Sequence, residues 1–283
     1  MTQKLNILAV TQLPSMARYR ENLRKEPQFA VNVVTDLDKA REAMDDPAKQ
    51  TDVLVLDNGL GDDVHQLIKE VRQTYPRLLI ILIDESADFA MPGRADDVTT
   101  TPFENDDLIT RIKRLHEDRH LQTLRADALP SVRVFAKSLL KAGKGKAKQQ
   151  AAVEAIKEIG YDYVAFYALT ATNPPEMTLV AQVGPNDAIS GAPKKQEYEG
   201  SLIGWVVRNG QSRIITPTDE LSHPFLQKKR YFTGVCVPVG TTMRFGVLFA
   251  CKEAENSITQ ENVMILELVS AQLASALAKD ARG

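Results

Sequence analysis

The sequence is poor in cysteine and has no long apolar run. Its two cysteines, Cys236 and Cys251, are too few for a disulfide framework or a four-cysteine metal site, and they lack the CxxC spacing of a redox motif. The longest apolar run, residues 163–169, has seven residues, whereas a membrane span needs roughly 18 or more. No basic segment followed by an apolar stretch opens the chain, so no signal peptide is predicted. We therefore expect a cytoplasmic protein that does not enter the membrane.

An excess of charge of one sign is also lacking. The 283 residues include 35 Lys and Arg and 37 Asp and Glu, and 43% of them are hydrophobic. Residues 1–125 hold 17 basic and 22 acidic residues, and the remainder holds 18 and 15, so the two halves carry −5 and +3. Neither half is basic enough for the phosphate contacts that dominate nucleic-acid affinity, and direct nucleic-acid binding is not expected. The length and apolar content predict two domains, each with its own core.

Residues 1–122 predict a doubly wound α/β domain. Short apolar runs bounded by turn residues alternate with helical patterns, which is typical of a parallel sheet covered on both faces. Five strands are expected, at residues 5–10, 31–34, 53–56, 78–83 and 98–100. Sites in such sheets lie at the carboxyl ends of the strands, which here are residues 11–12, 57–59, 84–86 and 101–102.

Two segments of this half carry a family resemblance. Residues 52–57 read Asp-Val-Leu-Val-Leu-Asp and are followed by Leu-Gly-Asp at 60–62, and residues 95–103 end in Pro-Phe. In these segments the chain resembles the flavodoxin-like receiver domain of response regulators, over about residues 3–122. The resemblance implies that Asp57 stands at the phosphoacceptor position. Receivers also place an acidic pair after the first strand and a lysine before the final proline, and here Thr11 with Gln12 and Thr101 stand at those positions.

These replacements bear on phosphorylation. Magnesium prefers carboxylate and water oxygens, and phosphoryl transfer needs cations that offset the developing negative charge. One carboxylate and no lysine supply neither, so we predict a pseudo-receiver with a vestigial pocket formed by Asp57, Thr11, Gln12, Asp84 and Thr101. A phosphorylation-controlled regulator that still uses Asp57 is the alternative. The stretch between residues 83 and 98 is short for a full fourth helix with its loops, which predicts an altered switch surface.

A helical connection is predicted between the two halves. Leu108, Ile112 and Leu115 repeat at helical spacing, and a polar continuation runs to about residue 124 before Pro130 interrupts it. We place a helical linker at residues 123–130 and a second helix at 131–140. Four lysines within residues 141–148 are interpreted as a solvated turn rather than a nucleotide or membrane patch.

Residues 131–283 predict an α+β domain with an antiparallel sheet. Strands are expected at residues 163–169, 177–183, 213–215, 234–239 and 245–251, and the spacing of the last two suits a hairpin. Four segments of this half also resemble a known family. They are residues 201–211, 233–239, 244–251 and the start of the last helix at 258–266. They resemble the GAF family. The resemblance implies a small-molecule pocket between the sheet and about residues 185–232, and dimerisation through terminal helices.

Aromatic and polar residues flank this implied pocket. They are Trp205, His223, Phe225, Phe232 and Cys236. The aromatic rings could stack on a planar ligand, although ordinary core packing is the favoured interpretation, and His223 reads as a loop residue. The cyclic-nucleotide motif of the family is missing, and Cys236 precedes Val237 rather than the histidine usual at bilin attachment sites. No cofactor is therefore predicted, and the identity of any ligand is left open.

A catalytic alternative comes from the same family, because free methionine sulfoxide reductases use a GAF scaffold. That chemistry needs a thiolate of lowered pKa and an accessible resolving cysteine. Cys236 and Cys251 both fall in predicted strands, and whether they share a sheet face depends on the hairpin register. His116 and His120 lie four apart on one helix face, but a solvated face is favoured over a metal arm, and no metal site is predicted.

The last helix carries one apolar stripe that we predict to be a dimer helix. Its members are Val263, Leu266, Val269, Leu273 and Leu277. No enzyme motif was found, so the favoured interpretation is a non-catalytic signalling adaptor or sensor subunit. It is expected to form a homodimer through its GAF and linker helices, to bind an unidentified signalling protein, and to bind a small molecule in the GAF pocket.

Overall fold

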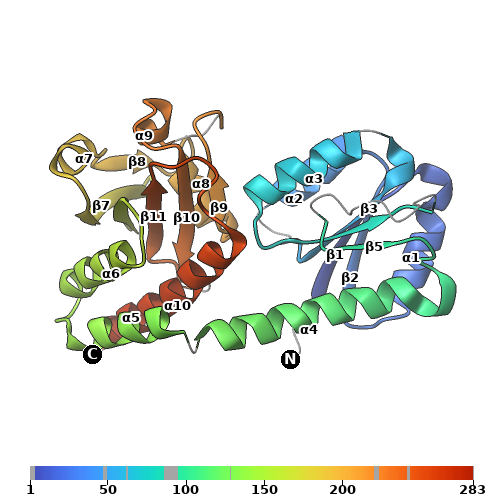
Figure 1. The fold of residues 1–283 in the computed structure, drawn as a ribbon, viewed down its shortest axis with the longest axis horizontal. Coiled ribbons are helices and arrows are strands. Elements are labelled where there is room, and N and C mark those ends of the chain that lie inside the picture. Colours follow the sequence, from blue (N-terminus) through green and yellow to red (C-terminus); the bar gives the residue numbers. More distant parts are fainter. Residues whose placement is uncertain are drawn as a thin grey trace. The chain divides into compact units, whose positions relative to one another are not determined.

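A computed structural model describes residues 4–46, 50–61, 63–85, 95–127, 129–219, 223–240 and 243–282 (Figure 1). The chain forms two compact units. The first consists of residues 1–73 and 78–122, and the second of residues 74–77 and 123–283. Helix α4 (Asp107–Asp127) is continuous from the first unit into the second. Residues 123–127, the first part of the segment predicted as a helical linker, belong to this helix.

The first unit is built on a five-stranded, all-parallel sheet. Its strands are β1 (Leu5–Val10), β2 (Phe29–Val34), β3 (Val53–Asp57), β4 (Leu79–Ile83) and β5 (Asp97–Thr99). The strand order β2-β1-β3-β4-β5 is the flavodoxin-like order, which confirms the predicted doubly wound α/β class. The middle strands β3 and β4 are buried along almost their whole length, which explains why they read as continuous apolar runs.

Helices cover both faces of this sheet. They are α1 (Met16–Arg24), α2 (Leu37–Asp45), α3 (Asp63–Thr74) and α4. Buried residues of α1 and α4, among them Leu23 and Ile112, share one core with β1, β3 and β4, while α2 and α3 lie on the opposite face (Figure 1). The predicted shortening of the segment between β4 and β5 concerns residues 86–94, which lie outside the described part of the chain.

The second unit is built on a six-stranded antiparallel sheet. Its strands are β6 (Tyr163–Leu169), β7 (Glu176–Val183), β8 (Lys195–Glu197), β9 (Arg213–Ile215), β10 (Thr233–Val239) and β11 (Gly246–Lys252). The sheet order is β8-β7-β6-β11-β10-β9, and the predicted hairpin pairs β10 with β11. The sequence prediction missed β8, because its three residues are polar and lie at the sheet edge.

Long helices cover one face of the second sheet and short helices lie on the other. The long ones are α5 (Pro130–Lys141), α6 (Lys146–Glu158) and α10 (Gln260–Arg282), and the short ones are α7 (Asn186–Gly191), α8 (Leu202–Asn209) and α9 (Pro224–Gln227). Within α8, a Cβ atom on Gly204 would stand 2.1 Å from the backbone oxygen of Tyr198. Glycine is therefore what lets α8 approach this backbone.

The apolar stripe of α10 belongs to the core of the second unit. Val263, Val269 and Leu273 are 0% exposed, Leu266 is 1% exposed and Leu277 is 6% exposed. They pack with α5, α6 and the facing strands, so they stabilise the single chain and are not free for a partner helix. By length and composition α10 is also the one helix of the described residues that could cross a membrane, but its stripe is occupied by this core.

Candidate functional site

The carboxyl end of β3 places Asp57 at the edge of the parallel sheet, where three groups donate hydrogen bonds to it. The Thr11 hydroxyl and the Tyr19 hydroxyl both donate to Oδ2, at 2.7 Å and 3.1 Å. The backbone N–H of Gly59 donates to Oδ1 at 2.9 Å. Thr11 and Tyr19 are themselves buried, so these bonds satisfy two hydroxyls that are removed from water.

Two further predicted residues join the same loop. The Gln12 amide donates to the backbone oxygen of Gly59, and the Asn58 amide donates to Asp84 Oδ2 at 3.0 Å. The structure therefore gathers Thr11, Gln12 and Asp84 around residues 57–59. Sheet topology alone accounts for this, because the carboxyl ends of β1, β3 and β4 are neighbours.

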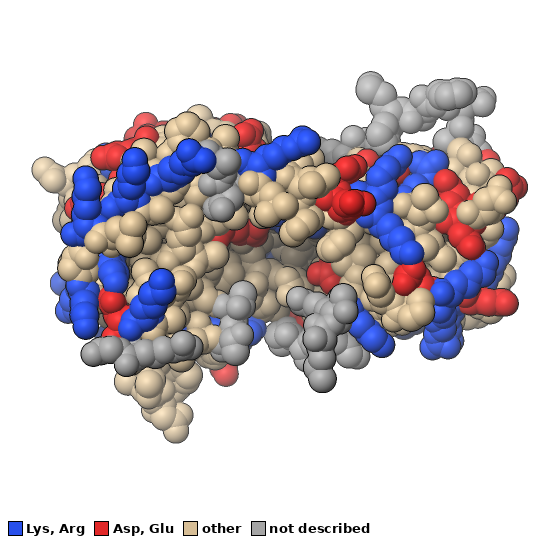
Figure 2. Space-filling view, turned by 90° about the horizontal axis from the view of Figure 1, so that it is seen from below, with Lys and Arg blue, Asp and Glu red and all other residues tan. Residues whose placement is uncertain are grey.

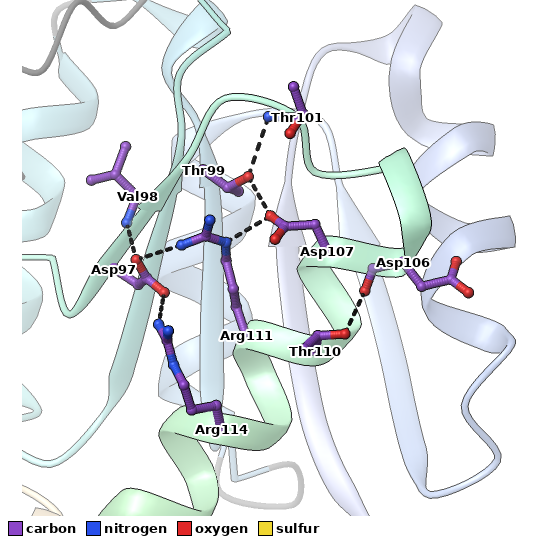
Figure 3. Close-up of polar contacts among 9 residues, drawn as sticks. All are labelled: Asp97, Val98, Thr99, Thr101, Asp106, Asp107, Thr110, Arg111 and Arg114. Atoms are coloured by element: carbon purple, nitrogen blue, oxygen red, sulfur yellow. Dashed lines mark hydrogen bonds and ion pairs between the residues drawn. The ribbon is translucent and has the colours of Figure 1, made fainter.

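Thr101 takes part in a different network, between β5 and α4. Its backbone N–H donates to the Thr99 hydroxyl at 3.3 Å, and that hydroxyl donates to Asp107 at 2.7 Å. Figure 3 shows Arg111 between Asp107 and Asp97, at 2.6 Å and 2.9 Å. Burial alone would raise the pKa of Asp107, but the hydrogen bonds from Arg111 and Thr99 more than offset this and lower it. These hydrogen bonds and ion pairs connect the edge strand β5 to α4.

Tyr19 is the part of this site that the sequence analysis missed. Burial, and then the nearby charge of Asp57, raise the pKa of the tyrosine well above its ordinary value, so it stays a neutral donor. The ion pairs of the described residues do not include one between Asp57 and a Lys or Arg. Hydroxyl and amide donors therefore surround Asp57, and they contribute no positive charge.

In the second unit, both cysteines lie on the sheet face that carries the short helices. Cys236 pairs with Phe249 across the β10–β11 ladder, and Cys251 pairs with Gly234. This register makes the cysteines diagonal neighbours on one face, roughly 7–8 Å apart by sheet geometry. Both are free thiols with 0% exposure. Burial raises the pKa of each thiol, so neither forms a thiolate readily.

His223 is buried on the same face, with 2% exposure. Its Nδ1 accepts from the backbone N–H of Phe225 at 3.3 Å and so caps α9, while Nε2 lies 3.4 Å from the Tyr167 hydroxyl. Because Nδ1 accepts, we assign the ring hydrogen to Nε2, which donates to Tyr167; Tyr167 in turn donates to the backbone oxygen of Pro193 at 3.1 Å. Burial lowers the pKa of His223 to about 3, so the ring is neutral.

The other predicted pocket residues are packed as well. The His223 ring lies 4.1 Å from that of Phe249, and the Phe225 ring lies 5.0 Å from that of Tyr163. Trp205 is 8% exposed and lies under the guanidinium of Arg213, 5.1 Å away. Phe232 is half-buried at the start of β10. Aromatic rings thus occupy the sheet face where the resemblance implied a ligand.

A family model described as GAF domain matches residues 149–278. This segment is a GAF domain. It runs from the first turn of α6 into the last turns of α10 and contains every residue predicted for the ligand pocket. The match leaves out the first unit. No curated protein matches the chain.

Solved structures similar to the chain include several GAF-type proteins. The free methionine-R-sulfoxide reductase of Neisseria meningitidis, solved with its substrate, is 17% identical, with a TM-score of 0.46, 52% of this chain covered and 86% of that one. The GAF domain of an Acinetobacter phosphoenolpyruvate-protein phosphotransferase is 15% identical, with a TM-score of 0.46 and coverages of 54% and 93%. A segment of a methyl-accepting chemotaxis protein is 19% identical, with a TM-score of 0.44 and coverages of 52% and 97%.

The chemistry available in the GAF domain is limited by burial. Its two cysteines are buried thiols, and its one buried histidine is held neutral by its surroundings. Among the residues that the structure describes, no three His, Cys, Asp or Glu side chains are grouped so that they could hold a metal ion. What the domain offers instead is a packed aromatic face and a set of covering helices.

Proposed function

We propose that the chain is a non-catalytic signalling adaptor or sensor subunit that acts through protein contacts. In this proposal the first unit is a receiver-like domain that is not phosphorylated, and the GAF domain senses a small molecule or supports dimerisation. The observation that carries the proposal is the hydrogen bonding of Asp57, whose two oxygens accept from Thr11, Tyr19 and Gly59. GAF domains are typical of sensor and signalling proteins, which supports the second half of the proposal.

The surroundings of Asp57 oppose phosphorylation on electrostatic grounds. A phosphoryl group brings a charge of roughly −1.5 to −2. A metal ion held by acidic oxygens, together with a lysine, would have to offset this charge. Here Thr11 and Gln12 supply neutral donors, and Thr101 has no charge and bonds to Thr99. Modification of Asp57 at Oδ2 would also disturb the hydrogen bonds that two buried hydroxyls donate to this oxygen.

The GAF domain supports a binding role better than a catalytic one. A sulfoxide reductase needs a reactive thiolate, and both thiols of this domain are buried with raised pKa values. The proposal further includes a homodimer, a cytoplasmic location, and no direct contact with nucleic acid or membrane.

The experiment is incubation of the full chain with acetyl phosphate and magnesium, followed by intact mass measurement and amide NMR spectra. We expect no added phosphoryl mass and no shifts around residues 57–59. The matched control is Asp57→Asn, which identifies modification at any other residue. A phosphoryl mass that appears on the wild type and not on Asp57→Asn would refute the proposal and favour the phosphorylation-controlled regulator.

A further inference from the structure

Two large apolar side chains stand out on the surface of the described residues. Leu140 is 85% exposed and Leu13 is 71% exposed, more than any other large hydrophobic residue there. Leu140 lies on α5 in the second unit, and Leu13 lies three residues beyond the end of β1, at the carboxyl edge of the parallel sheet. Basic residues flank Leu140 on α5, and exposed acidic residues follow the strands that end at the edge where Leu13 lies. Figure 2 shows charged side chains of both signs on the surface of each unit.

Leu140 belongs to a basic surface on the outer side of α5. This α5 surface consists of Arg133, Val134, Lys137, Leu140 and Lys141, all exposed. At 100° per residue the five fall within an arc of about 120°, opposite the buried face of the helix.

The cations of the α5 surface have no acidic partner among the described ion pairs. Lys148, one turn into α6, does have one, because it pairs with Asp280 at 2.5 Å. Arg133, Lys137 and Lys141 are spaced four apart, and like charges at this spacing repel one another and destabilise a helix. The α5 surface thus carries repulsion that an acidic surface docked on it would relieve.

Leu13 belongs to an acidic surface at the carboxyl edge of the parallel sheet. This sheet-edge surface consists of Leu13 with exposed Asp63 and Glu85, over the half-buried Asp57 and Asp84. The bond from Gln12 to Gly59 brings the Leu13 segment against the loop that follows β3. The charge of Glu85 also acts on Tyr19, the partner of Asp57, so these groups are neighbours.

We propose that the α5 surface of one chain docks on the sheet-edge surface of a second copy, with Leu140 against Leu13 and the basic side chains against Asp63 and Glu85. Each chain carries both surfaces, so each of two copies can offer one surface to the complementary surface of the other. The division of charge between the halves, −5 and +3, agrees with this pairing. The inference rests on the proposed function as an adaptor that works through protein contacts, and it names one partner and its surface.

Paired charge reversal in the full chain tests the proposal by sedimentation equilibrium. One variant reverses the α5 surface, Lys137→Glu with Lys141→Glu, and the other reverses the sheet-edge surface, Asp63→Lys with Glu85→Lys. We expect a wild-type dimer that weakens as salt rises, and at least tenfold weaker self-association for each variant. An equimolar mixture of the two variants should restore dimers, because each reversed surface then meets its complement.

The matched control is Lys194→Glu with Lys228→Glu, the same charge change at exposed sites outside the α5 surface, and it should dimerise like the wild type. Restoration in the mixture also shows that both variants fold. A monomeric wild type, variants that dimerise like the wild type, or a mixture that stays monomeric would each overturn the proposal. A membrane partner would overturn it too. In that case the wild type would bind phosphatidylserine vesicles instead of a second copy, and the variant Lys137→Glu with Lys141→Glu would no longer bind them.

The outcomes of this test and of the acetyl phosphate experiment distinguish the docking proposal from the proposed function. Phosphorylation of Asp57 would refute the adaptor proposal and leave the complementation of reversed charges intact. A wild-type dimer that takes up no phosphate, and whose charge-reversed variants dimerise like the wild type, would refute the docking proposal alone.

Discussion

Lowering the pH from 7 to about 5 should destabilise the GAF domain through one side chain, His223. In the unfolded chain this histidine takes up a proton below its ordinary pKa of 6.5, whereas burial holds the folded pKa near 3. The unfolded state therefore binds more protons over this range, and the free energy of unfolding falls as the pH falls. The loss is about 1.4 kcal/mol for each pH unit below 6.5, or about 2 kcal/mol between pH 7 and 5.

The assay is urea unfolding at a series of pH values, followed by the fluorescence of Trp205. This is the one tryptophan of the chain and it lies in α8, so its signal reports the GAF domain. The matched control is His223→Asn, whose side-chain oxygen can still cap α9 and which does not titrate. Carboxylates titrate in both proteins, so the difference between the two pH profiles isolates the histidine.

The difference should grow by about 2 kcal/mol as the pH is lowered, in the direction that favours the variant. A constant difference between the two proteins would refute the reasoning, because it would mean that His223 is protonated as easily in the folded domain as in the unfolded chain. Loss of ring packing in His223→Asn shifts the free energy of unfolding equally at every pH and leaves this comparison intact.

Three further outcomes are expected from other sites. Tyr19→Phe removes one donor to Asp57 and should lower the stability of the first unit by about 0.5–1.5 kcal/mol in calorimetry, and an unchanged transition would mean that this bond contributes nothing. Leu266→Ala should destabilise the GAF domain by about 2–5 kcal/mol in urea, since Leu266 is a core residue, whereas a changed sedimentation profile with unchanged stability would restore the dimer-helix interpretation. Cys236 and Cys251 should react with a thiol reagent only as fast as the domain opens, and fast reaction in the folded protein would reopen the reductase alternative.

The sheets could be predicted from the sequence where burial leaves a pattern. Strands such as β3 and β4 are apolar along their length because helices cover both faces, and they were found with their boundaries nearly right. The edge strand β8 is short and polar, so its residues resemble those of a loop. The hairpin register was open at the sequence level, because a shift by one residue would put Cys236 and Cys251 on opposite faces. The pairing of Cys236 with Phe249 in the structure fixes the register and places both cysteines on one face.

The site around Asp57 could be predicted only in part, for a similar reason. Thr11 and Asp84 follow strands that neighbour β3, so topology alone brings them to Asp57. Tyr19 comes from the packing of α1 on the sheet, which the strand ends do not reveal. In the sequence, Tyr19 and Leu23 are spaced four apart, which predicts that both lie on the buried face of a helix. This spacing does not indicate which group the Tyr19 hydroxyl binds. For Thr101 the structure shows a backbone hydrogen bond to Thr99, whose hydroxyl donates to Asp107, and its predicted place beside Asp57 stays a prediction.

The ion pairs of the described residues give Asp57 no Lys or Arg partner, and this bears on the charge of the sheet edge. The donors Thr11 and Tyr19 are neutral, so they satisfy the carboxylate without cancelling its charge, and Thr101 brings none. On the proposed function this edge cannot change its charge by phosphorylation, and it presents the same acidic surface at all times. On the same proposal, a signal enters at the GAF domain and changes what docks on the chain, because the sheet edge is not switched by phosphorylation.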